Sequence, residues 1–143
     1  MSDSLELDKS KAQNLSLTRI KEAEILLKEN CFAGAYYLAG YSVELALKAV
    51  ICKKFKRETI PDKNFVQSLY THKLDDLMTK SELKFKFEND KKANSQLDTY
   101  WTVVTKWNEN SRYDLKSEQD ATSIINAIND PQNGILSWIK QHW

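Results

Sequence analysis

The residues best suited to chemistry include a charged pair within an apolar stretch. Glu44 and Lys48 are four residues apart, which places them on one face of a helix. The surrounding segment is apolar nearly all round the helix, and a charge buried there requires a partner. Tyr37 and Tyr41 lie on the same side. The pair is therefore either a structural ion pair or part of a polar pocket, and both interpretations stay open.

The chain has two histidines, His72 and His142, the residue type whose ordinary pKa lies closest to neutral pH. His72 follows Thr71, a candidate N-cap, so one interpretation is a half-buried ring that packs a helix start. The functional interpretation is a base, or a phosphate contact, that faces Arg112. Arg112 itself either bonds to a helix end or stacks on Trp107. Arg112 and His72 are thus the candidate catalytic residues.

Composition disfavours several other kinds of site. Three glycines in 143 residues leave no phosphate-binding glycine loop, and no G-x-S-x-G or H-E-x-x-H motif is present. Cys31 and Cys52 lie in helical apolar patterns without metal-ligand spacing, so we expect both to be buried and reduced. We expect no metal and no cofactor. With 21 basic and 20 acidic residues, the net charge of +1 provides no global attraction to nucleic acid or membranes.

The elements that position these residues are predicted to be helices, because glycine and proline are scarce and apolar residues recur at helical spacing. Residues 81–92 are predicted to be a loop, since Phe85 and Phe87 alternate as in a short extended piece. Together these patterns predict one all-α domain over residues 1–143, an up-and-down bundle of four to five helices with a loose tail over about 1–8. The predicted helices cover about 8–30, 32–56 and 91–107, a short stretch after Thr71, a stretch from Ser117 with Asp120 completing a capping box, and a last stretch from Asp130-Pro131.

The chain is expected to be cytoplasmic, without contact to a membrane. Its acidic start lacks the features of a signal peptide. The longest uncharged run, residues 31–43, is well below the roughly 20 residues that span a bilayer. The basic run of Lys53, Lys54, Lys56 and Arg57 is interpreted as the solvated end of the second helix rather than as an RNA contact.

Three segments together resemble a known family of helical bundles. Residues 34–49 form a small-residue, aromatic-rich helix that carries Glu44 and Lys48 one turn apart. Residues 71–77 contain a His-x-Leu-x-x-Leu element, and residues 107–113 begin with Trp and end with Arg-Tyr. In order and spacing these segments resemble the HEPN family.

The resemblance implies a bundle of four or five helices that is often dimeric. Members are frequently encoded beside nucleotidyltransferases in toxin–antitoxin or anti-phage systems. Many are metal-independent ribonucleases that carry an Arg followed, after four to six residues, by a His. The His can move a proton at the ribose or the leaving oxygen, and the Arg can stabilise charge on the phosphate.

This chain departs from that pattern at the catalytic motif. Arg112 matches the family's arginine, but residues 113–119 contain no His. Asp114, Lys116 and Glu118 lie in that window, and their ordinary pKa values are poorly placed for proton transfer at neutral pH. The expected general acid or base is therefore absent, and an enzyme is the less favoured interpretation.

Three function hypotheses follow. The first is a non-catalytic HEPN-like module that dimerises or binds another protein, such as a nucleotidyltransferase. The second is a metal-independent endoribonuclease with an altered site around Arg112, to which His72 contributes in space. The third is a protein that binds RNA or nucleotide without turnover. The resemblance implies a homodimer, because the family commonly buries its second and last helices across a two-fold axis; the Gly, Ala and Tyr surface of the second helix, wide enough for more than one neighbour, motivates this expectation. The candidate ligand-binding residues are Glu44, Lys48, Arg112, Tyr113 and Asp114.

Overall fold

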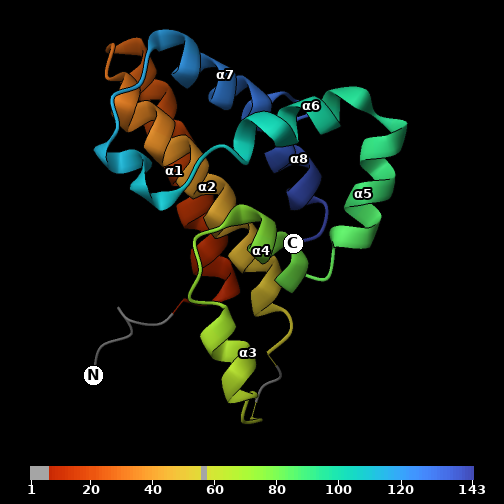
Figure 1. Ribbon diagram of the computed structural model, residues 1–143. Coiled ribbons are helices and arrows are strands. Elements are labelled where there is room, and N and C mark those ends of the chain that lie inside the picture. The colour runs from red at the N-terminus through yellow and green to blue at the C-terminus, as the bar shows by residue number, and fades with distance from the viewer. Residues whose placement is uncertain (1–6, 56–57) are drawn as a thin grey trace, which may run out of the picture.

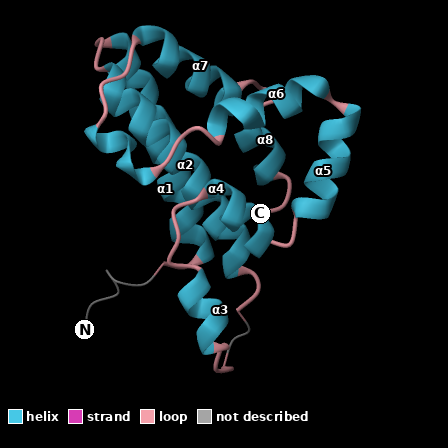
Figure 2. Cartoon of the chain, in the orientation of Figure 1, coloured by secondary structure: helices cyan, strands magenta, loops and turns pink. Residues whose placement is uncertain are grey.

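The computed structural model describes residues 7–55 and 58–143, and this part of the chain is helical without strands (Figures 1 and 2). The prediction of an all-α bundle is confirmed. The helices are more numerous and shorter than predicted. They are α1 (Lys9–Lys28), α2 (Phe32–Cys52), α3 (Lys63–Ser68), α4 (Leu74–Lys80), α5 (Lys84–Ala93), α6 (Ser95–Val104), the 3₁₀ helix η1 (Glu109–Tyr113), α7 (Glu118–Asn129) and α8 (Ile135–Lys140).

Helix α2 is central, as its all-round apolar pattern predicts. It runs beside α1 and contacts α4, α7, α8 and η1 (Figure 1). Its buried face is built mainly from Ala, Val and Leu side chains. Because small residues allow close approach, the neighbouring elements pack directly on the α2 backbone. This contact positions η1 and the segment before α4 along one side of α2.

Gly40 of α2 shows how close this approach is. A Cβ atom placed on Gly40 would lie 2.2 Å from the Trp107 ring, well inside van der Waals contact. The indole Nε1 of Trp107 donates a hydrogen bond to the carbonyl oxygen of Tyr37 at 3.0 Å. Trp107 is thereby fixed on α2, and η1 begins two residues later.

The prediction of a loop over residues 81–92 is wrong, because α5 occupies most of this range. Phe87 is fully buried, while Phe85 is 80% exposed. Residues two apart point to nearly opposite sides of a helix. The spacing of Phe85 and Phe87 therefore fits one exposed and one buried residue of a helix as well as it fits a strand. Phe87 packs edge-on against Trp101 of α6 and Trp138 of α8, with ring centroids 4.9 and 4.7 Å apart.

Four boundaries also differ from the predictions. The helix predicted over 91–107 is divided at Asn94, whose side chain accepts from two backbone N–H groups and starts α6. Thr71 precedes the actual N-cap of α4, Lys73. Asp130 caps a turn over residues 131–133, and α8 begins at Ile135. Helix α2 ends at Cys52, before the predicted 56.

Predictions near the chain start and at the cysteines have mixed outcomes. Asp8 caps α1, with Lys11 N–H donating to its Oδ1 at 2.7 Å, so it belongs to the helix start rather than to a tail. Residues 1–6 of the predicted tail, like residues 56–57 of the basic run, lie outside the described residues. Cys31 is exposed, not buried, because it lies at the turn between α1 and α2. Cys52 is half-buried, and both thiols are free.

The capping box predicted at the start of the helix after Ser117 is confirmed. Ser117 accepts from Asp120 N–H, and the Asp120 carboxylate accepts from Ser117 N–H. Hydrogen bonding from the backbone N–H and the side chain of Ser117 favours the ionised carboxylate, so the pKa of Asp120 is lowered. Of the helices in the described part of the chain, none combines the length and apolar character that crossing a membrane requires.

Candidate functional site

The centre of the candidate site is Glu44, which is 2% exposed in the middle of α2. Its Oε2 atom is 3.0 Å from the Nζ atom of Lys48, one turn further along the helix. Both of its carboxylate oxygens are also 3.0 Å from Nδ1 of His72. The i, i+4 pair is therefore a real ion pair, and it has a third member that is 28 residues away in the sequence.

His72 lies in the segment that leads from α3 into α4, and it bridges two elements. Its second ring nitrogen, Nε2, is 3.1 Å from Oε2 of Glu109 on η1. Carboxylate oxygens only accept hydrogen bonds, so both contacts are hydrogen bonds when the ring carries a proton on each nitrogen. The His72 ring thus connects the buried carboxylate on α2 with a partly exposed carboxylate on η1.

The 3₁₀ helix η1 brings Arg112 to the same region. Asn108 and Ser111 form a capping box at its start. Residues three apart in a 3₁₀ helix share a face, so Glu109 and Arg112 project from the same side. Between His72 and Arg112 themselves, no direct bond is found in the described part of the chain. The structure brings the two candidates to neighbouring elements without joining them.

Arg112 is exposed and its guanidinium lies over the ring of Tyr113, 4.8 Å from the centroid. Hydrogen bonding to the Tyr113 and Tyr37 side chains raises the pKa of Arg112 above its ordinary value. The predicted stacking on Trp107 is wrong, since Trp107 is buried against α2. The candidate ligand-binding residues Tyr113 and Asp114 are both exposed beside Arg112, with Tyr113 at 75% exposure.

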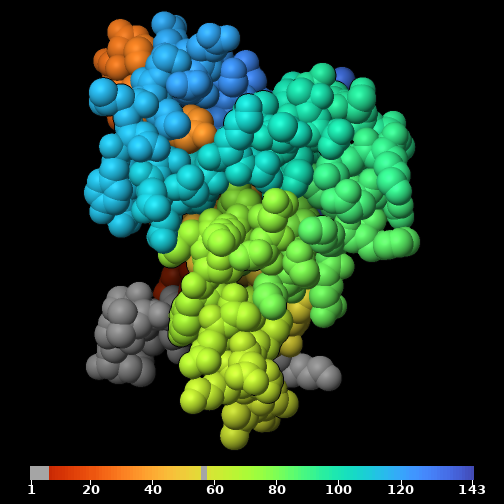
Figure 3. All heavy atoms as spheres, in the orientation of Figure 1, coloured from red at the N-terminus to blue at the C-terminus, as the bar shows by residue number. Residues whose placement is uncertain are grey.

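A hollow of about 240 Å³ opens beside the His72 ring. Figure 3 shows the segment around η1 next to the segment that leads into α4 on one face of the molecule. Its lining comes from the segment before α4 and from the start of η1. The lining residues are Tyr70, Thr71, His72, Lys73, Asn108, Glu109 and Asn110.

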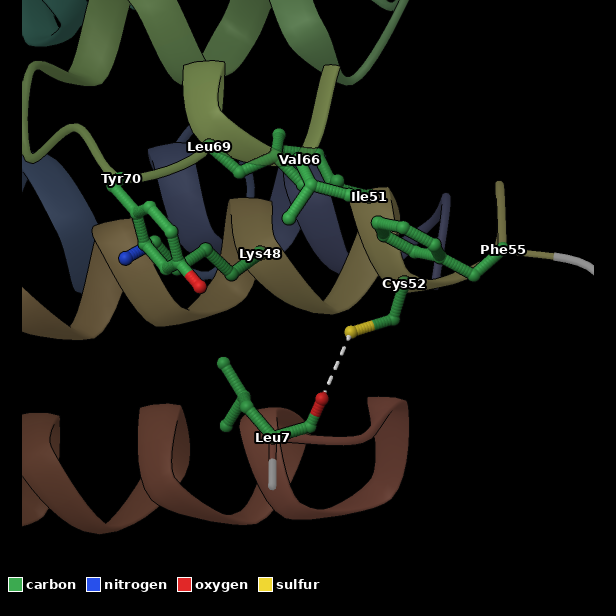
Figure 4. A pocket seen from close by; sticks show the side chains of 8 residues that line it. All are labelled: Leu7, Lys48, Ile51, Cys52, Phe55, Val66, Leu69 and Tyr70. Carbon is green, nitrogen blue, oxygen red and sulfur yellow. Dashed lines mark hydrogen bonds between the residues drawn. The ribbon is translucent and has the colours of Figure 1, made fainter. Parts of the chain in front are cut away.

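A second, mainly apolar hollow of about 270 Å³ lies along the last turns of α2 (Figure 4). Lys48 joins the two regions, since its side chain lines this hollow while its ammonium group binds Glu44. The Cys52 thiol points toward the Leu7 carbonyl oxygen at 3.7 Å, and burial raises its pKa. A thiol with a raised pKa is a poor nucleophile at neutral pH. The remaining lining comes from Ile51, Phe55, Val66, Leu69 and Tyr70.

A buried carboxylate behind an imidazole orients the ring for proton transfer. Here, however, the outer nitrogen of His72 faces Glu109 rather than an open acceptor. Two carboxylates also make the surroundings of His72 unfavourable for a phosphate group. No group of His, Cys, Asp and Glu side chains suited to a metal ion is found among the described residues.

Sequence reasoning missed two features of this site. Glu109 had no signal in the sequence, since it is one of 20 acidic residues and its contact with His72 is tertiary. The apolar hollow depends on α3, which was not predicted because its six residues carry only a short apolar pattern. An N-cap signal, Asp62 before Phe65, marks the start of α3.

Comparison with known proteins gives one match. The family model described as HEPN domain matches residues 16–141 of the chain. Neither the comparison with curated proteins nor the comparison with solved structures gives a match.

Proposed function

The chain belongs to the HEPN domain family, and within that family we propose that it is a non-catalytic module that acts by binding a second copy of itself. The same surface would serve a partner protein of the nucleotidyltransferase type. The family often occurs in toxin and ribonuclease-like systems. A toxin–antitoxin or anti-phage system is therefore the proposed setting.

The observation that carries this proposal is the state of the acid–base groups near Arg112. The window after Arg112 contains no His. His72, the His nearest to η1, has a carboxylate against each ring nitrogen. A general base must be within hydrogen-bond reach of the proton that it removes. In this arrangement the ring of His72 is committed to Glu44 and Glu109.

Exposed apolar side chains beside Arg112 support association. Tyr113, the last residue of η1, is 75% exposed, and Leu115, in the segment between η1 and α7, is 96% exposed. The ammonium group of Lys116 lies 4.5 Å from the centroid of the Tyr36 ring, which ties this segment to α2. Aromatic residues and arginine are enriched at protein interfaces. HEPN domains commonly dimerise, and this corner is the proposed contact surface.

Light scattering across micromolar concentrations tests the proposal. The unmodified protein should have the mass of a dimer, and Leu115→Ser should shift it toward the monomer. Phe85→Ser is the matched control, because Phe85 is 80% exposed on α5, outside the proposed surface. A monomeric mass for the unmodified protein would contradict the proposed association, and so would an equal change of mass in both variants.

The proposed location is the cytoplasm. Both cysteines are free, which fits a reducing compartment.

The proposal also includes the binding of RNA or nucleotide without turnover. The exposed Arg112 can contact a phosphate or stack on a base. Binding of this kind would weaken steeply as salt concentration rises.

A second candidate function is a metal-independent endoribonuclease, and one observation favours it. Glu44 lies behind Nδ1 of His72, which is the arrangement that orients a catalytic imidazole. Glu109 is partly exposed and would have to leave Nε2 for His72 to act on a substrate held by Arg112. This candidate requires RNA cleavage that is lost in both His72→Gln and Arg112→Ala.

A further inference from the structure

The Glu109 side chain lies between two cationic groups that could bind it. Its Oε2 atom is 3.1 Å from Nε2 of His72, in the segment before α4. Arg112 follows Glu109 by three residues on η1, and residues with this spacing share one face of a 3₁₀ helix. Glu109 therefore has a histidine on one side and an arginine on its own helix face.

The contact between Glu109 and His72 depends on a proton of the ring. A carboxylate accepts a hydrogen bond from Nε2 only when that nitrogen carries a hydrogen. Nδ1 of the same ring is 3.0 Å from Glu44. A neutral imidazole has one N–H group, so it donates to one carboxylate and presents a lone pair to the other. Loss of one proton thus turns one of the two contacts into a repulsion.

The contact with Glu44 is the one that persists when the ring is neutral. Glu44 is 2% exposed, so its charge requires partners within the protein. Lys48 is one partner at 3.0 Å, and the hydrogen on Nδ1 of His72 is the second. The side chain of Glu109 is 44% exposed, so water can solvate its carboxylate. The neutral ring should therefore keep its hydrogen on Nδ1 and release Glu109.

The charged groups around His72 come from three elements. They are Glu44 and Lys48 on α2, Glu109 and Arg112 on η1, and Lys73 and Asp76 at the start of α4. Asp76 is 3.4 Å from the Thr71 hydroxyl. Among these groups, Glu109 is the carboxylate that both contacts the ring and is partly exposed, so it is the one that can change its partner.

Arg112 is available for the released carboxylate. Its guanidinium is exposed and lies 4.8 Å from the centroid of the Tyr113 ring. No ion pair of Arg112 is found in the part of the chain that the structure describes. Rotation of the two side chains is enough to pair them on one helix face. The η1 backbone can stay in place, since the capping box of Asn108 and Ser111 holds its start.

We propose that Glu109 exchanges partners under the control of a proton on His72: it pairs with the protonated ring at acidic pH and with Arg112 once the ring is neutral. The inference rests on the proposed association, because Arg112 lies at the proposed contact surface. While Glu109 is on His72, Arg112 is free to contact a second copy of the chain. Once Glu109 is on Arg112, that contact is lost, so association should weaken as the pH rises.

The exchange has a consequence for catalysis. When Nε2 of His72 is free, Glu109 occupies Arg112, and when Arg112 is free, Glu109 occupies Nε2. The two groups that an altered ribonuclease site would need are therefore not free at the same time. This alternation agrees with a module that binds without turnover.

Nitrogen-15 NMR of the His72 ring and of the Arg112 side chain tests the exchange independently of association. From about pH 5.5 to about pH 8, where imidazole groups ordinarily titrate, the ring should lose the hydrogen on Nε2 and keep the one on Nδ1. The Nε signal of Arg112 should move over the same pH range. His72→Gln and Arg112→Lys assign the signals.

Glu109→Gln is the decisive variant for the NMR experiment, because its amide carries no charge to exchange. The Arg112 signal should then stay in place while the His72 ring still titrates. A ring that stays protonated over the whole range would overturn the proposal. So would an Arg112 signal that does not follow the ring in the unmodified protein, or that moves equally in Glu109→Gln.

The dissociation constant of the dimer measures the effect on association. It should rise about threefold for each Arg112 between the two pH values, and so about tenfold for a two-fold symmetric dimer. Glu109→Gln should associate tightly at both pH values, and His72→Gln weakly at both. Glu24→Gln, at an exposed position of α1, and His142→Gln are the controls and should keep the pH dependence. Circular dichroism verifies that each variant is folded.

The two experiments separate this inference from the proposed function. A protein that is monomeric at every concentration refutes the association, and the NMR experiment then decides the exchange by itself. A dimer whose dissociation constant does not change with pH would overturn the inference and leave the association intact. An equal pH dependence in Glu109→Gln would have the same meaning.

Discussion

His72 faces a carboxylate at each ring nitrogen, whereas His142 is surrounded by Lys53, Lys86 and Asp90 and has one buried ring nitrogen without a partner in the described part of the chain. The first ring bridges α2 and η1, and the second packs on Trp138 of α8. One residue type thus has two different electrostatic surroundings. The comparison teaches that tertiary contacts satisfy both ring nitrogens of His72, while one ring nitrogen of His142 is buried by packing alone among the described residues.

The largest expected effect comes from removing the carboxylate that holds His72. Glu44→Ala leaves Lys48 and His72 without their shared buried partner, so the free energy of unfolding should fall by about 3 kcal/mol. Urea unfolding measures this change. Glu24→Ala, at an exposed position of α1, is the control and should change stability by less than about 0.5 kcal/mol. Equal stability of the two variants would show that the Glu44 network is not a structural unit.

A smaller effect is expected from Gly40→Ala, which perturbs the His72 side of the comparison alone. The new Cβ would lie 2.2 Å from the Trp107 ring, so overpacking should cost about 2 kcal/mol and displace η1. The NMR signal of His72 should shift while that of His142 stays in place. Gly34→Ala is the matched control, because its Cβ would meet only the flexible Leu26 side chain at 3.2 Å. Shifts of both histidine signals would contradict the independence of the two regions.

The smallest expected effect is a pH dependence that originates at His142. Because the folded pKa of His142 is lowered, the unfolded chain binds this proton more readily. The contribution to stability is present above the ordinary pKa of about 6.5 and is lost as the pH falls toward the folded value. Urea unfolding at neutral pH and at about pH 5 should show this loss in the free energy of unfolding. The loss should be smaller than about 1 kcal/mol, because the ring is only partly buried. His142→Gln should lack it; an unchanged pH dependence in that variant would refute the assignment.

The local features of this fold could be predicted from the sequence. The apolar pattern predicted α1 and the central α2, and Ser117 with Asp120 predicted the start of α7. These features depend on neighbours within one or two turns. Helix α5 was missed because only one of its residues, Phe87, is buried, and that burial depends on tryptophans contributed by α6 and α8.

The residues of the site were predicted from the sequence, but the contacts among them were not. Glu44, Lys48, His72 and Arg112 were all identified as candidates from the sequence. The bond from His72 to Glu44 spans 28 residues, and the bond to Glu109 depends on how Trp107 fits on Gly40. No local pattern encodes such contacts. The contact between Lys53 and the His142 carbonyl oxygen was missed for the same reason, since these residues are 89 apart and meet only in the folded chain.

The central claim is that His72 is held by carboxylates and does not act as a catalytic base beside Arg112. Cleavage of mixed cellular RNA by the purified protein in EDTA tests this claim most directly, with Arg112→Ala and His72→Gln measured in parallel. The account predicts no cleavage by the unmodified protein, even at high protein concentration. Cleavage that disappears in both variants would contradict it and would establish an altered ribonuclease site.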